Sequence, residues 1–183
     1  MRARSLAWVL AGVALALGGV YAVGMVTPAH QQAVQGDTLG RQPGEGAGEY
    51  VARSGASLSN SSQPAFALVT FRTPLAPPEA ERVVAGAPRV SALLLVDAPP
   101  QPIPEPSPGQ TRADVFAREA GRVATAAERN GVELDPGRVA SVVVRADGAT
   151  LRAIAADPGV EAVEALPPDA VWGAFGISPV SSF

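Results

Sequence analysis

Residues 139–166 read VASVVVRADGATLRAIAADPGVEAVEAL, and this stretch decides the fold. It begins with a β-branched run of strand length at Val139–Arg145. Asp147 can cap a short helix, which ends at Asp157-Pro158-Gly159. Val160–Leu166 predicts a second strand with an irregularity, because the spacing of its two Glu residues breaks strict alternation. The stretch therefore predicts a β-α-β unit.

A second unit of the same kind lies upstream. Ala65–Phe71 and Val90–Val96 are apolar runs of strand length. Between them Pro77 and Pro78 open a short helix, because proline is tolerated in a first helical turn, and Gly86 can end it. This part of the chain also predicts strand, helix and strand.

A connector and a longer helix separate the two units. Six prolines lie within Asp97–Thr111, which excludes a helix or an inner strand and predicts an extended, Pro-rich insertion. Arg112–Asn130 follows as the clearest helix outside the N-terminal region. The order of elements predicts an α+β fold, a ferredoxin-like sandwich of two β-α-β units with an inserted helix.

Residues 139–166 resemble the second half of the subtilisin propeptide family of protease inhibitors. The likeness lies in a strand, the short helix ATLRAIAADPGV and the strand VEAVEAL. It implies a ferredoxin-like fold and inhibition or chaperoning of a protease. The Pro-rich insertion departs from the family pattern, and so does the Pro167-Pro168-Asp169 turn, which leads into an aromatic segment.

Residues 6–26, LAWVLAGVALALGGVYAVGMV, are uncharged and mostly apolar. As a helix they span about 31 Å, close to the hydrocarbon thickness of a bilayer, so they predict one transmembrane helix. Arg2 and Arg4 precede it and no basic residue follows until Arg41, which places residues 1–5 in the cytoplasm. The side chains expected to contact membrane lipid are Leu6, Trp8, Val9, Leu15, Leu17, Val20, Tyr21 and Val26.

A cleaved signal peptide is the alternative to this signal-anchor. Val20-Tyr21-Ala22 and Thr27-Pro28-Ala29 are passable cleavage sites, although the apolar core exceeds the usual h-region of about 15 residues. In both cases the remainder is exported. Residues 27–64, rich in Gln, Gly and Ser, predict a flexible linker, and residues 65–183 an extracytoplasmic domain.

The composition excludes several classes of function. A net charge of −3 gives no electrostatic footprint for nucleic acid. The chain has neither Cys nor Lys, which removes disulfides, thiolate metal sites, thiol nucleophiles, phosphate-loop lysines and Schiff bases. The single His30 lies just past the predicted anchor. Enzymes built only on carboxylates remain compatible with this composition, but we expect no catalytic site and no cofactor. The exclusive use of Arg as the basic residue fits the codon bias of a GC-rich, bacterial genome.

The strands near residues 90–96 and 139–144 are apolar at successive positions, which predicts that both faces of their sheet are covered. A plain four-stranded sandwich covers one face. The aromatic segment Val171–Val180, the inserted helix or another chain can cover the second. The last alternative predicts a protein-interaction module or a homodimer that binds through the sheet. The expected partner-contact residues are Leu93, Leu95, Val142 and Val144.

Four acidic residues, Asp157, Glu161, Glu164 and Asp169, lie near one another in the sequence. A calcium site would need their oxygens to converge in one loop. They are spread over a helix end, a strand and a Pro-Pro turn, so we expect a solvated acidic edge and no metal site.

Overall fold

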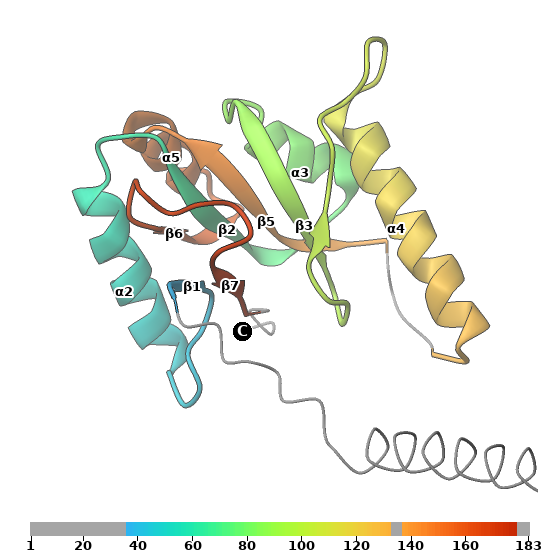
Figure 1. Cartoon of the computed structure of the whole chain (residues 1–183), viewed down its shortest axis with the longest axis horizontal. Coiled ribbons are helices and arrows are strands. Elements are labelled where there is room, and N and C mark those ends of the chain that lie inside the picture. The colour runs from blue at the N-terminus through green and yellow to red at the C-terminus, as the bar shows by residue number, and fades with distance from the viewer. Residues whose placement is uncertain (1–35, 133–136, 179–183) are drawn as a thin grey trace, which may run out of the picture. The chain divides into compact units, whose positions relative to one another are not determined.

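The structure is a computed structural model that describes residues 36–132 and 137–178. In chain order the elements within these residues are β1 (Thr38–Leu39), α2 (Ala47–Asn60), β2 (Ala65–Leu75), α3 (Pro77–Val83), β3 (Arg89–Leu95), β4 (Gln101–Pro102), α4 (Arg112–Arg129), β5 (Val139–Ala146), α5 (Gly148–Ala155), β6 (Val160–Ala165) and β7 (Gly176–Ile177). They build one five-stranded sheet in the order β4-β3-β5-β2-β6 and one parallel pair, β1 with β7 (Figure 1).

All pairs in the large sheet are antiparallel. β5 lies between β2 and β3, and β6 pairs with the other side of β2. β2 and β3 therefore run in the same direction and are joined through α3. In the same way β5 and β6 run together and are joined through α5. The predicted α+β class is confirmed.

The segment 139–166 folds as its sequence predicts. The Asp147 side chain caps α5 by accepting a hydrogen bond from the backbone N–H of Thr150 at 2.8 Å. The predicted irregularity is a bulge, because the partners of Thr70 and Phe71 across β6 are Ala162 and Val160, two residues apart.

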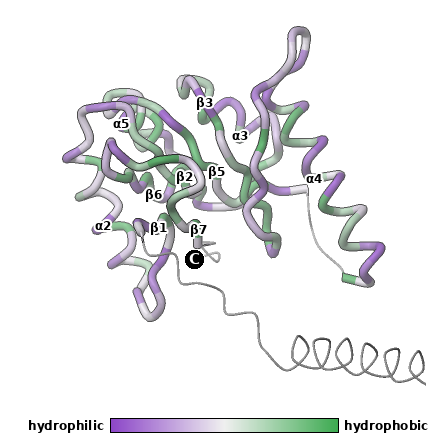
Figure 2. Tube along the Cα trace, viewed as in Figure 1, coloured by the Kyte–Doolittle hydropathy of each residue, from purple (hydrophilic) through white to green (hydrophobic). Residues whose placement is uncertain are grey.

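One face of the large sheet packs against α3, α4 and α5. The largest fully buried side chain of this hydrophobic core is Phe116 of α4. Figure 2 shows the hydrophobic residues following the strands. The Pro-rich insertion supplies β4, which pairs with the outer side of β3, where a proline is tolerated because it need not donate to the ladder.

The predicted partner-contact residues lie in this first core. Leu93, Leu95, Val142 and Val144 are all buried beneath the helices. The prediction that they contact a partner is wrong, because the molecule's own helices, including the inserted α4, cover the side of the sheet that they face.

The second face of the sheet is covered by the two ends of the described chain. Leu39 of β1 and Tyr50 of α2 pack there, together with Phe175 and Ile177 near the C-terminus. The prediction that both faces are covered is confirmed. The aromatic segment contributes to this cover as far as residue 178. The segment that contains β1 and α2 also contributes, which the sequence did not predict.

The predicted flexible linker over residues 27–64 is wrong for its second half, which contains α2. The Glu49 carboxylate accepts the backbone N–H of Gly46 at 2.8 Å and so caps the first turn. Tyr50, Ser54 and Leu58 recur every four residues and form one buried stripe. The sequence does not predict this helix clearly, because its buried stripe holds a Ser and because two glycines lower the helix propensity. Residues 27–35 lie outside the described residues.

The predicted membrane helix, residues 6–26, also lies outside the described residues, as do residues 1–5. Within residues 36–132 and 137–178, no helix combines the length and the apolar character needed to cross a bilayer.

Candidate functional site

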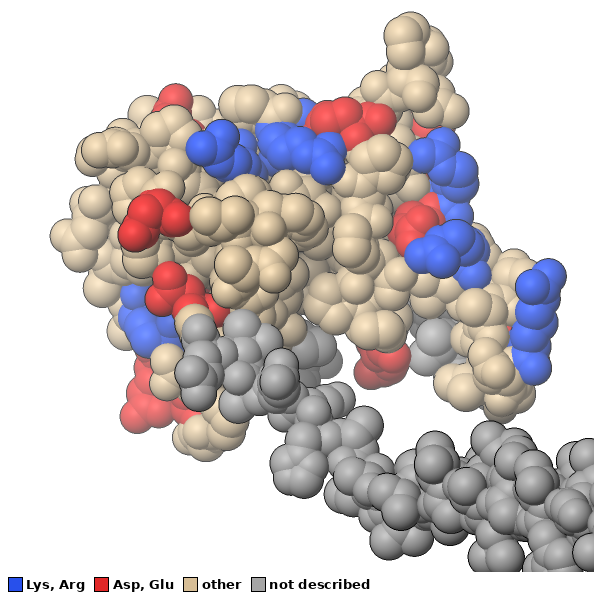
Figure 3. Space-filling view, in the orientation of Figure 1, with Lys and Arg blue, Asp and Glu red and all other residues tan. Residues whose placement is uncertain are grey.

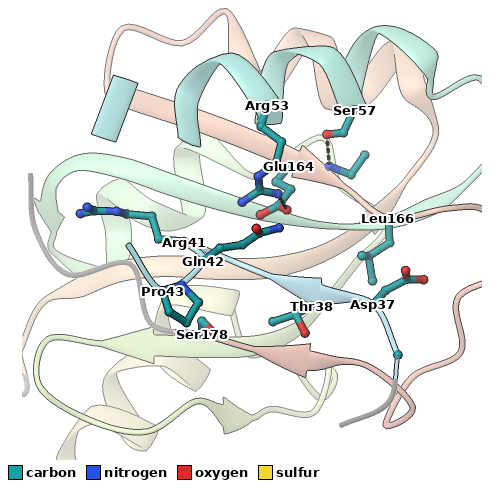
Figure 4. A pocket seen from close by; sticks show the side chains of 12 residues that line it. Asp37, Thr38, Arg41, Gln42, Pro43, Arg53, Ser57, Glu164, Leu166 and Ser178 are labelled. Atoms are coloured by element: carbon teal, nitrogen blue, oxygen red, sulfur yellow. Dashed lines mark hydrogen bonds and ion pairs between the residues drawn. The ribbon is translucent and has the colours of Figure 1, made fainter. Parts of the chain in front are cut away.

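A cleft of about 560 Å³ opens where β1, α2 and β6 meet (Figure 4). Its walls come from segments that are far apart in sequence. The residues that line it are Gly36, Asp37, Thr38, Arg41, Gln42, Pro43, Arg53, Ser57, Glu164, Ala165, Leu166 and Ser178.

Glu164 is a buried carboxylate at this cleft, with the residue only 4% exposed. One of its oxygens accepts the backbone N–H of Gly40 at 2.7 Å, and the other accepts the guanidinium of Arg53. Arg53 also donates to both oxygens of Glu45, at 2.7 and 2.9 Å, and to the carbonyl of Gly40 at 2.9 Å. This ionic junction, formed by Gly40, Glu45, Arg53 and Glu164, joins the segment after β1 to α2 and β6.

The junction shifts the pKa values of its members. The hydrogen bond from Arg53 lowers the pKa of Glu45 to about 2, and the same bond raises the pKa of Arg53. Burial raises the pKa of Glu164, against the opposing effects of the Gly40 N–H and the Arg53 guanidinium. Because both oxygens of Glu164 are already occupied, this carboxyl is poorly placed to take a proton from a substrate.

Local structure explains why Glu164 faces inward. Side chains two apart in a strand share a face, so Glu164 points to the same side as Ala162 and Leu166, which belong to the second core. On the neighbouring helix, the hydroxyl of Ser57 accepts the backbone N–H of Ala165 at 2.9 Å. The outer edge of β6 is thus partly satisfied by α2, which limits its pairing with another strand.

The rim of the cleft is polar. The side chains of Asp37, Thr38 and Gln42 are on exposed residues and make no hydrogen bond to any other described residue. Arg41 is held differently, because its guanidinium donates to the carbonyl of Glu45 at 2.6 Å. The rim therefore offers both hydrogen-bond donors and acceptors to a ligand.

A second exposed feature is the segment 167–175, here called the tryptophan loop. Its residues Val171 and Trp172 are 65% and 41% exposed. The Trp172 ring lies 5.7 Å from the ring of Phe66 and 5.7 Å from that of Phe175, measured between centroids. The guanidinium of Arg145 lies 5.7 Å from the centroid of the Phe66 ring.

The four acidic residues singled out from the sequence are not brought together. Asp157 pairs with Arg82 at 3.1 Å, Glu161 pairs with Arg72, and Asp169 is exposed. The prediction of a solvated edge is wrong for Glu164, because the alternation of β6 turns it inward. Among the residues that the structure describes, no three His, Asp or Glu side chains are placed to hold a metal ion.

The sequence analysis missed the partners of Glu164. The signal for Glu164 itself was present, since an acidic residue two positions from Ala162 and from Leu166 shares their buried face. No comparable signal pointed to Arg53, which lies on α2 within the predicted linker.

The chain matches no protein-family model, no curated protein and no solved structure.

Proposed function

We propose that this protein is a single-pass membrane protein whose extracytoplasmic domain is a protein-interaction module. The anchor is the predicted helix over residues 6–26, with the N-terminus in the cytoplasm. The module holds an extended, polar segment of a partner protein in the cleft between β1, α2 and β6.

The observation that carries this proposal is the contrast between the ionic junction, which forms the frame of the cleft, and the polar rim. The frame is rigidly cross-linked by the ionic junction, whereas the rim presents Asp37, Thr38 and Gln42 with hydrogen-bonding groups unused within the described residues. A rigid frame with free polar groups lowers the entropic cost of binding, which favours recognition.

The same geometry favours recognition over catalysis. A catalytic carboxyl must reach its substrate with a free oxygen, whereas both oxygens of Glu164 are engaged by Gly40 and Arg53. The carboxyl of Glu45 is engaged by Arg53 in the same way.

We also propose that the domain is ferredoxin-like. The order β6-β2-β5-β3 and the two connections through α3 and α5 support this finer assignment. The β1–α2 segment, α4 and β7 would then be additions to that core.

Protease inhibition, which the resemblance of residues 139–166 implies, receives less support. The segment after β6 turns back over the second face of the sheet, and its strand β7 pairs with β1. A segment that is packed in this way is not free to enter the cleft of a protease.

Site-specific photo-cross-linking in native membranes tests the proposed function. A photoreactive residue replaces Gln42 at the cleft or, as a matched control, the equally exposed Gln110 beyond the Pro-rich insertion. We expect one discrete cross-linked product from position 42 and none from position 110. A band at twice the mass of the chain would identify the partner as a second copy. Identical patterns from both positions would refute a specific cleft.

A further inference from the structure

The tryptophan loop is an apolar protrusion on a domain whose other large apolar side chains are mostly buried. Val132, Val171 and Trp172 are the large hydrophobic residues exposed within the described ranges, and two of these three are adjacent. The tryptophan loop, dark red in Figure 1, crosses the front of the sheet. The surface there is largely uncharged (Figure 3).

The loop is held in place rather than left loose. The backbone N–H of Ala174 donates to the carbonyl of Val171 at 3.0 Å, and that of Ala170 to Pro167 at 3.1 Å. Trp172 also contacts two aromatic rings, as described above. These contacts leave Val171 and one side of Trp172 facing solvent, so the apolar tip is presented at little entropic cost.

The tip lies close to the point where the chain comes from the predicted anchor. Gly176, four residues after Trp172, pairs with Thr38, and its backbone N–H donates to the carbonyl of Asp37 at 3.0 Å. Only residues 27–37 separate this point from the end of the predicted membrane helix. Whatever their conformation, eleven residues reach at most about 40 Å.

Because β1 and α2 belong to the domain, 11 residues rather than the predicted 38 separate it from the predicted anchor. A domain tied so closely to a bilayer meets its surface at a high effective concentration, so a weak contact is enough to hold it there. This step rests on the proposed anchor.

We infer that the tryptophan loop is a second membrane contact, which docks the domain on the outer surface of the bilayer. Tryptophan concentrates at the membrane interface, because its ring is apolar and its N–H group needs a polar partner. Val171 adds apolar area beside it. Arg145, which has no carboxylate within ion-pair distance among the described residues, can meet a lipid phosphate.

Lipid is favoured over a protein partner by the size of the patch. A stable protein interface buries about 800 Å² on each partner, and two adjacent apolar side chains are a small part of that area. Insertion of a loop tip into the interface needs no complementary surface. The loop itself carries the acidic Asp169, so we expect the docking to depend on the apolar tip and only weakly on anionic lipid.

The fluorescence of Trp172 tests this inference directly. The chain has two tryptophans, and Trp8 lies in the predicted span, so Trp8→Phe in the full chain leaves Trp172 as the single reporter. The protein is reconstituted into phosphatidylcholine vesicles that carry a nitroxide either at the headgroup or deep in the acyl chain. We expect at least a twofold loss of Trp172 emission with the headgroup nitroxide and a smaller loss with the deep one.

Two variants supply the controls. In the Trp8→Phe background, Val171→Asp should reduce the quenching, whereas Val132→Asp at the distant exposed valine should leave it unchanged. Trp172 emission that is quenched by neither nitroxide would overturn the inference. Quenching that varies with the number of protein copies per vesicle would also overturn it, because the loop would then contact a second copy. Release of the chain from vesicles by carbonate would instead show that the anchor, and with it the proposed function, is wrong.

Discussion

The two faces of the five-stranded sheet are built in different ways. The first face packs apolar side chains against α3, α4 and α5, together with Leu58 from the end of α2. The second is closed by β1, α2 and the C-terminal segment. It contains a hydrogen bond between Tyr50 and Thr70 at 3.3 Å and the ionic junction at Glu164. It also contains a buried Ser141 hydroxyl that has no hydrogen-bond partner among the described residues. The difference leads us to expect that the first face carries most of the stability, whereas the second face forms the cleft to which we assign the proposed recognition.

The largest expected effect comes from the first face. Phe116→Ala removes a fully buried ring of α4 and should lower the free energy of unfolding by about 3–5 kcal/mol. Urea unfolding, followed by Trp172 fluorescence in a Trp8→Phe background, measures it. If Phe116→Ala lowered the free energy of unfolding by less than a substitution on the second face does, the assignment of the two faces would be reversed.

The ionic junction should give the largest effect on the second face. Arg53→Met leaves the buried Glu164 without its cation and should cost on the order of 2 kcal/mol. This lies below the cost for fully buried pairs, because the Arg53 side chain is 32% exposed. Adding Glu164→Gln to the same chain should recover part of the loss. Equal losses in the single and double variants would show that the pair is not coupled.

Two serines on the second face are expected to contribute differently to stability, because only one of them makes a hydrogen bond within the described residues. Ser57→Ala deprives the backbone N–H of Ala165 of its acceptor and should cost about 1 kcal/mol. Ser141→Ala removes a buried hydroxyl that has no partner and should be neutral or slightly stabilising. The same urea measurement compares them, and a greater cost for Ser141→Ala would contradict the observed hydrogen bonding.

The last expected effect depends on pH. The folded pKa of Glu45 is about 2, below the ordinary value near 4.5, so its contribution to stability is present above about pH 4.5 and is lost as the pH falls towards 2. Glu45→Gln should therefore be less stable than the parent at neutral pH, and the difference should disappear on acidification. A difference that grows on acidification would contradict this charge state.

The first face was largely predictable from the sequence, because its elements are local and strongly patterned. The stretch from Val139 to Leu166 has a β-branched run, a capping Asp147 and a Pro-Gly stop, and each acts within a few residues. Both β-α-β units followed from such signals.

The second face was not predictable to the same degree. The stripe of α2 combines Tyr50, Ser54 and Leu58, which is too polar to be recognised as a buried face. Its helix is stabilised by contacts with β6, more than a hundred residues away in sequence. The junction of Arg53 with Glu164 depends on the same long-range pairing, so neither the cleft nor the helix over residues 47–60 could be inferred from the sequence.

Hydrogen exchange of individual backbone amides in the full, membrane-reconstituted chain tests the account most directly. If the ends of the chain close the second face, the N–H of Gly40, bonded to Glu164 at 2.7 Å, and the N–H of Ala165, bonded to Ser57, should both exchange much more slowly than in an unstructured peptide. Slow exchange in β2 and β5, together with unprotected amides at Gly40 and across residues 47–60, would contradict it. That result would restore a flexible linker and remove the cleft.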